Sequence, residues 1–152
     1  QSDIKAITPI RFCENETVNL ILSTFMNKAK QAGVAMRAEA KLPKSIPFSD
    51  TELCSLLSNG LENAIAATAA CSDPEHRTVV VKAMIHKNYL LILIENPYTG
   101  EIVMGGGLPQ PSREGHGYGT RSMAAIADAH GGQAIFSADN GVFTLKILLP
   151  LN

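Results

Sequence analysis

The sequence predicts a two-layer α/β sandwich in which a mixed, mostly antiparallel sheet carries about three helices on one face. Three observations support this fold class. Three segments have apolar residues at helical spacing, and five shorter ones are β-rich or alternate apolar with polar residues. These segments follow the order helix, strand, helix, strand, strand, long loop, helix, strand, strand. Two strand pairs carry hairpin signals, so most of the sheet is expected to be antiparallel.

The helices are predicted by apolar spacing and by their end signals. They cover residues 14–31, 49 to about 71, and about 120–129. Gly33 is a natural stop for the first helix. The second opens with a capping box: the Ser49 hydroxyl can accept from the third helical amide, and Glu52 can reach back to the Ser49 amide. His130-Gly131-Gly132 ends the third.

The strands are predicted at residues 34–42, 78–85, 89–95, 133–137 and 142–149. Residues 86–88 join two of them in a hairpin, and Asp139-Asn140-Gly141 joins two others, since Asn-Gly between strands is a strong turn signal. Residues 97–119 contain three consecutive glycines and several prolines without clear periodicity. A loop of that length in a compact domain is usually functional or disordered.

Length and composition favour one soluble domain spanning residues 1–152. The net charge of -1 shows no basic footprint, so no nucleic-acid partner is expected. The longest apolar run, Tyr89–Ile94, is strand-sized, and no signal peptide is recognised, so we expect a cytoplasmic domain without membrane contact. Three cysteines and four histidines lack the spacing of a metal site, and we expect the cysteines to be small core residues.

A pair of asparagines is the most informative feature of the second helix. Asn59 and Asn63 lie four residues apart within an apolar run, although Asn costs roughly half a kcal/mol relative to Ala in a helix interior. Their spacing places both carboxamides on one face, opposite an apolar back formed by the leucines. This polar front could hold a metal ion, phosphates or water; the alternative is an ordinary solvated helix face.

A glycine-rich segment, Gly115-His116-Gly117-Tyr118-Gly119, leads directly into the third helix. Glycines allow a backbone to approach a ligand closely, and the amides at a helix N-terminus favour phosphate. Neither common phosphate motif is matched, because no strand precedes the glycines and Gly119-Thr120-Arg121 is not a Walker sequence. A flexible loop without a ligand remains the alternative.

Four motifs together resemble the GHKL family of ATPase domains. Asn59-x-x-x-Asn63-Ala64 resembles its N box, and Ile94-Glu95-Asn96 stands where the G1 box begins. The segment from Gly115 to Gly119 resembles the G2 box, which follows the ATP lid. The terminal G3 segment is resembled by Gly141-Val142-Phe143-Thr144. The resemblance covers roughly residues 15–150 and implies the Bergerat fold of gyrase, Hsp90, MutL and histidine kinases. The helix and the His-Gly-x-Gly loop are most similar to sensor kinases of the AgrC type.

The resemblance implies a site for ATP and Mg²⁺, with Asn59 and Asn63 as the catalytic pair. Asn63 would coordinate Mg²⁺, and Asn59 would support the metal, its water or a phosphate. Asn96 would face the adenine amino group. The other positions implied at the nucleotide are Gly100, Gly115, His116, Gly117, Tyr118, Gly119, Thr120, Arg121 and Thr144. The glycines would wrap the phosphates, Thr144 would lie near the base, and Arg121 and Arg113 are candidate counter-charges for the γ-phosphate.

The chain departs from the family pattern at three places. The G1 box usually opens with Asp, whereas Asn96 offers a carboxamide oxygen without a charge-assisted bond. The glycine continuation of that box is absent unless Gly100 serves. Many histidine kinases carry Lys or Arg soon after the N box, where Ala66 and Ala67 stand here. The nucleotide affinity is therefore expected to be modest.

The histidine that accepts phosphate in a sensor kinase lies on a dimerising helix before this kind of domain. All four histidines here follow residue 75. We therefore expect a C-terminal catalytic domain, with residues 1–13 as a linker, that cannot autophosphorylate alone. The γ-phosphate would pass to a histidine of the absent helical domain and then to a response regulator. The full-length protein would be a homodimer and a membrane-bound sensor whose cytoplasmic part includes this domain.

Other functions remain open. A GHKL-shaped nucleotide-binding or protein-interaction module without turnover is one alternative, and an anti-sigma-factor serine kinase is another. Gyrase-like ATPases usually have Glu at the position of Asn59, as a base for the attacking water. Asn59 cannot accept a proton in that way, so free ATP hydrolysis should be slow.

Overall fold

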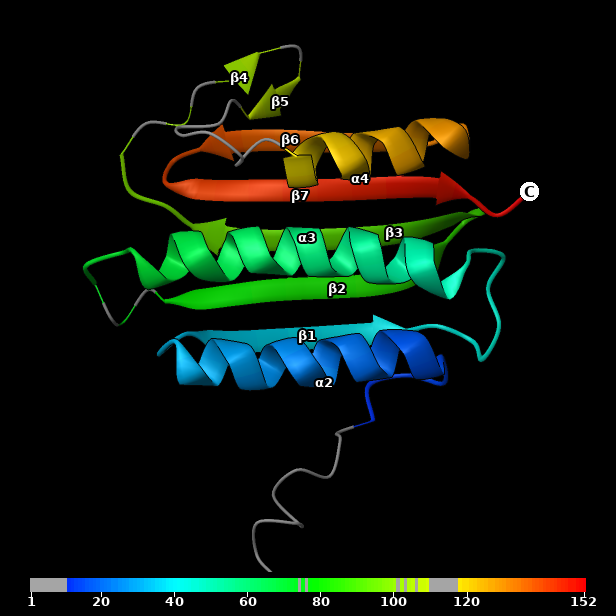
Figure 1. Ribbon diagram of the computed structural model, residues 1–152, viewed down its shortest axis with the longest axis horizontal. Coiled ribbons are helices and arrows are strands. Elements are labelled where there is room, and N and C mark those ends of the chain that lie inside the picture. The colour runs from blue at the N-terminus through cyan, green and yellow to red at the C-terminus, as the bar shows by residue number, and fades with distance from the viewer. Residues whose placement is uncertain are drawn as a thin grey trace, which may run out of the picture.

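The computed structural model describes residues 11–73, 75, 77–100, 102, 104–105, 107–109 and 118–152. One layer is a five-stranded sheet in the order β1-β2-β3-β7-β6. Its strands are β1 (Ala35–Lys41), β2 (Thr78–His86), β3 (Tyr89–Pro97), β6 (Gln133–Asp139) and β7 (Val142–Pro150). The other layer, on one face of this sheet, holds α2 (Glu16–Gln31), α3 (Asp50–Ala69) and α4 (Tyr118–Ala129), as Figure 1 shows.

The predicted two-layer sandwich with a mostly antiparallel sheet is confirmed. Among the described strands of the main sheet, β1 and β2 pair in parallel and the other three pairs are antiparallel. Two details differ from the sequence prediction. The glycine- and proline-rich segment contains a small hairpin of β4 (Met104–Gly105) and β5 (Leu108–Pro109), and α4 begins at Tyr118, so Gly119 is helical.

The local signals at the element ends are also confirmed. Ser49 Oγ accepts a hydrogen bond from the Glu52 amide, and Glu52 Oε1 accepts one from the Ser49 amide, which completes the capping box of α3. Asn140 and Gly141 both have positive φ, at 52° and 79°, between β6 and β7. Positive φ at two central residues is the geometry of a tight hairpin turn.

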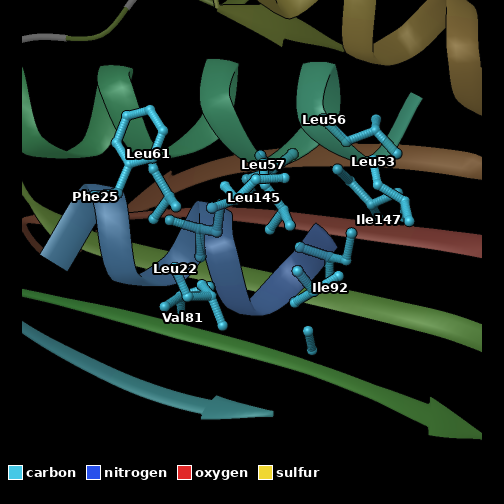
Figure 2. Packing of buried hydrophobic residues seen from close by; sticks show 14 of the residues in the cluster. Leu22, Phe25, Leu53, Leu56, Leu57, Leu61, Val81, Ile92, Leu145 and Ile147 are labelled. Atoms are coloured by element: carbon cyan, nitrogen blue, oxygen red, sulfur yellow. The ribbon is translucent and has the colours of Figure 1, made fainter. Parts of the chain in front are cut away.

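The core lies between the two layers. Leucines of α3 and apolar residues of α2 meet the inward side chains of the central strands, as Figure 2 shows. The residues labelled there are Leu22, Phe25, Leu53, Leu56, Leu57, Leu61, Val81, Ile92, Leu145 and Ile147. Each fully buried side chain of this kind contributes about 1.5–3 kcal/mol relative to its exposed state. Of the cysteines, Cys13 and Cys71 are buried as expected, whereas Cys54 is exposed.

Gly60 lets α3 lie directly on the sheet. A Cβ atom at this position would come within 2.6 Å of Ile94 Cδ1 and 3.0 Å of Leu145 Cδ2. These contacts join the middle of α3 to β3 and β7 at the centre of the core. Gly60 follows Asn59 directly, so the packing that requires a glycine also fixes the height of the asparagine above the sheet. Within the described part of the chain, no helix has both the length and the apolarity needed to cross a membrane.

Replacing Gly60 by Val is expected to lower the free energy of unfolding by about 3 kcal/mol, because the added methyl groups overfill the core against Ile94 and Leu145. Urea denaturation measures the change. The control is Ala66→Val on the exposed side of α3, which introduces the same β-branched side chain without a packing clash and should cost about 0.5 kcal/mol. Equal losses in the two variants would contradict the packing role of Gly60.

Candidate functional site

Asn59 lies where α3 meets the N-terminus of α4. Its side chain is half-buried, and its Nδ2 donates a hydrogen bond to Ser55 Oγ at 3.2 Å. On the α4 side, a Cβ atom at Gly119 would lie 3.2 Å from Asn59 Oδ1. A larger residue at 119 would therefore press on the carboxamide. The two segments singled out in the sequence, the asparagine pair and the end of the glycine motif, are brought into contact at this point.

The predicted polar front and apolar back of α3 are both present. Asn63 and Glu62 are exposed, whereas Leu57, Leu61 and Ala64 are buried beneath them. Asn63 lies one helical turn beyond Asn59, toward the C-terminus of α3. Its carboxamide is accessible to a ligand, and a carboxamide oxygen can coordinate a hard cation such as Mg²⁺.

The first turn of α4 has the electrostatics of an anion site. The first backbone amides of a helix have no intrahelical acceptor, and the helix dipole places partial positive charge there. Acidic residues are absent from this first turn, and Arg121 is exposed within it. Thr120 is buried. The turn can therefore favour phosphate or carboxylate.

Asn96 is a buried polar residue at the end of β3. The residue is 3% exposed, and its Nδ2 donates to the carbonyl oxygen of Pro97 at 2.8 Å. By the alternation of a strand, it shares a face with Ile94, which packs on Gly60 of α3. Asn96 therefore lies on the helix-covered face, two residues beyond the contact of Ile94 with α3. The strand β3 and α3 run in the same direction in Figure 1.

Thr144, which the resemblance places near the base, is not brought together with this group. It pairs with Glu95 across β3 and β7, and both side chains fall on the sheet face opposite the buried Ile94 and Leu145. The β7 residue opposite Asn96 is Phe143, which packs against the core and lies 6.2 Å from the Phe136 ring centroid. Because side chains alternate along a strand, Phe143 shares the inward face of β7 with Leu145. This alternation is the sequence signal for Phe143 as the residue on the helix-covered face.

The remaining predicted residues flank the site or lie outside the residues that the structure describes. Gly100 is exposed beyond the end of β3, with φ at 84°. Tyr118 begins α4, and its side chain is not described. Arg113, Gly115, His116 and Gly117 lie outside the described residues. Of the predicted set, the structure therefore brings together Asn59 and Gly119, with Asn63, Thr120 and Arg121 on the adjoining turns.

Sequence reasoning missed the contacts that hold α4 against α3. Ser55 Oγ lies 3.4 Å from Ser122 Oγ, and His130 Nε2 lies 2.7 Å from Glu52 Oε2. Phe48 meets the His130 ring edge-on, with the centroids 5.1 Å apart. Together with Asn59 beside Gly119, these contacts form a line that we call the α3–α4 polar seam.

The carboxylate of Glu52 takes part in both the seam and the capping box. The hydrogen bond to His130 lowers the pKa of Glu52 from its ordinary value, and the hydrogen bond from the Ser49 amide lowers it further. These bonds favour the charged carboxylate. The C-terminus of α4 is thus attached to the N-terminus of α3 by a pair whose strength depends on pH.

The comparison with protein families identifies the domain: residues 49–150 match the GHKL domain, and the chain belongs to this family. Family membership implies nucleotide binding. None of the curated protein sequences compared with the chain matches it significantly.

Solved structures of histidine kinases share the fold. The histidine kinase AdeS of Acinetobacter baumannii superimposes with a TM-score of 0.68 at 18% identity, over 90% of this chain and 64% of that chain. A nucleotide-free form of the catalytic domain of histidine kinase ThkA superimposes with a TM-score of 0.69 at 16% identity, over 90% of this chain and 92% of that one. At these identities the likeness establishes the fold alone.

The Glu52–His130 contact predicts a pH-dependent difference in thermal stability. Because the folded pKa of Glu52 is lowered, its stabilisation is present above the ordinary carboxyl pKa and is lost as the pH falls through the lowered value. Glu52→Gln retains an oxygen for the capping box but removes the charge. The wild type should melt at a higher temperature than Glu52→Gln at about pH 6, and this difference should shrink progressively as the pH falls below the ordinary Glu pKa of about 4.3.

The control for this measurement is Glu62→Gln, which neutralises an exposed carboxylate on the same helix. It should leave the melting temperature unchanged at about pH 6. If Glu52→Gln and the wild type have the same melting temperature at that pH, the contact between Glu52 and His130 does not stabilise the fold.

Proposed function

We propose that this domain is the ATP–Mg²⁺-binding catalytic domain of a bacterial sensor histidine kinase. The observation that carries the proposal is the contact between the Asn59 carboxamide and Gly119 in the first turn of α4. It joins an asparagine-bearing helix face to a helix N-terminus suited to anions. Buried Asn96 near the same helix supplies a polar group for a base, and membership of the GHKL family agrees with a nucleotide as the ligand.

The residues present fit a magnesium nucleotide. Mg²⁺ in such sites keeps several waters and takes only one or two protein oxygens besides the phosphates. The accessible carboxamide of Asn63 would supply one of these oxygens. The described residues contain no group of three His, Cys, Asp or Glu side chains that could hold a metal ion by themselves, so the phosphates would complete the site. When bound, the cation would neutralise charge on the phosphate oxygens.

The protein groups would act by positioning. The first turn of α4 would bind and orient the phosphates, Asn59 would accept a hydrogen bond from a water on the cation, and Asn96 would orient the adenine through its carboxamide. Phosphoryl transfer depends mainly on such alignment and on stabilisation of charge. Asn59 cannot remove a proton from water, which disfavours free hydrolysis and leaves the γ-phosphate for another acceptor.

The acceptor we propose is a histidine outside these 152 residues. Neither α2 nor α3 contains a histidine, and His130 is engaged by Glu52 at the far end of α4. A response regulator would then receive the phosphate, and the domain would work in the cytoplasm. One observation favours a second candidate, a binding module without turnover: the buried polar group on β3 is a neutral carboxamide, Asn96.

Calorimetric titration of ATP with and without Mg²⁺ tests the nucleotide site. The wild type should bind ATP only weakly without Mg²⁺, and Asn63→Ala should lose most of the Mg²⁺-dependent gain because a metal-binding oxygen is removed. The matched control is Asn27→Ala, an exposed asparagine on α2, which should bind like the wild type. A wild type that does not bind ATP at millimolar concentration would refute the proposal.

Incubation with γ-labelled ATP and Mg²⁺ tests the acceptor. The isolated domain should retain no acid-labile label, because the phosphoacceptor histidine lies outside it. His130→Ala should give the same result as the wild type. Acid-labile label retained on the wild-type chain would contradict an external acceptor, whether or not His130→Ala abolishes it.

A further inference from the structure

We propose that Ser55 is a positioning residue that sets the orientation of the Asn59 carboxamide toward the first turn of α4. The inference rests on the proposed function, since the bound ligand is taken to be ATP with Mg²⁺. Ser55 does not lie among the motif residues of the sequence. Its hydroxyl is placed one helical turn before Asn59 on α3, and it also faces α4.

The hydroxyl of Ser55 joins two side chains. Its oxygen accepts a hydrogen bond from Asn59 Nδ2 at 3.2 Å, and it lies 3.4 Å from Ser122 Oγ. A serine hydroxyl has one hydrogen to donate and two lone pairs to accept with. Ser55 can therefore accept from Asn59 while sharing a hydrogen with Ser122. This arrangement links the carboxamide on α3 to the first half of α4.

The amide group of Asn59 has two ends with opposite preferences. Fixing Nδ2 on Ser55 leaves Oδ1 on the side of Gly119, where a Cβ atom would lie 3.2 Å from it. The partial positive charge at the N-terminus of α4 favours an oxygen there over an NH₂ group. Ser55 and α4 therefore select the same orientation. Without Ser55, the NH₂ group has no partner on its own helix and the carboxamide gains rotational freedom.

This orientation matters for the ligand because Oδ1 and Nδ2 offer opposite chemistry. An oriented Oδ1 can accept from a metal-bound water, whereas a freely turning amide offers the correct atom only part of the time. Loss of a neutral hydrogen bond that holds one orientation corresponds to about a five-fold weaker Kd. Ser55→Ala should produce that change without unfolding the domain, since alanine is the best helix former.

The binding experiment uses calorimetric titration of ATP–Mg²⁺ into the 152-residue chain. Ser55→Ala should bind about five-fold more weakly than the wild type. The matched control is Ser58→Ala, which removes a hydroxyl from the same helix. The Ser58 hydroxyl contacts Cys54 Sγ at 3.6 Å, whereas the Asn59 side chain bonds Ser55. Ser58→Ala should bind like the wild type. Equal binding by Ser55→Ala and the wild type would overturn the proposal.

A double variant separates positioning from general damage. In the Asn59→Ala background, adding Ser55→Ala should cause no further loss of affinity, because the residue that Ser55 positions is already absent. A further five-fold loss in that background would show that Ser55 acts independently of Asn59 and would overturn the proposal.

A nucleotide-free readout distinguishes failure of this inference from failure of the proposed function. The side-chain amide signals of Asn59, assigned by their loss in Asn59→Ala, should shift in the ¹⁵N–¹H spectrum of Ser55→Ala and stay in place in Ser58→Ala. Unshifted signals in Ser55→Ala would overturn the proposal whether or not ATP binds. A wild type that binds no ATP–Mg²⁺ would refute the proposed function, and with it the role of Ser55 in binding.

Discussion

The contact of α3 with β3 and β7 at Gly60 is the constraint on which the rest of the site depends. A helix with leucines on its back can lie on a sheet at many heights, but only a glycine at this position allows Ile94 and Leu145 to come so close. Protein cores are packed at nearly crystalline density, so the height of α3 above the sheet cannot change without disturbing these contacts. Asn59 and Asn63 project from the other side of this helix, and their positions are set by the packing beneath them.

The fold was largely predictable because its main signals are local. The capping box of α3 and the Asn140-Gly141 turn each lie within a few residues, and both are present. The β4–β5 hairpin was missed because strands of two residues have no periodicity to recognise. The start of α4 lies earlier than predicted because a glycine at 119 favours a loop prediction, whereas in the structure Gly119 is helical and leaves room for the Asn59 carboxamide.

The candidate site was predicted in part, and the limits have physical causes. Asn59 and Gly119 were recognised separately, and their contact arises only when α4 packs on α3. The Ser55–Ser122 contact joins residues 67 positions apart, and no local pattern predicts it. The resemblance places Thr144 near the base without specifying a face of the sheet, and one residue of offset in a strand reverses the side on which a side chain lies. Tertiary contacts and strand parity, rather than composition, decide these details.

The two ends of the segment between β3 and α4 are attached to the domain independently of any ligand. The Tyr98 amide donates to the carbonyl oxygen of Gly141 at 3.0 Å, and Gly119 lies against Asn59. Most of the entropy of closing a loop is lost when its ends are fixed, and doubling the length between fixed ends costs only about 0.6 kcal/mol more. Segments of very different length could therefore be inserted between these two anchors while the domain stays folded, which leaves this stretch open to evolutionary change.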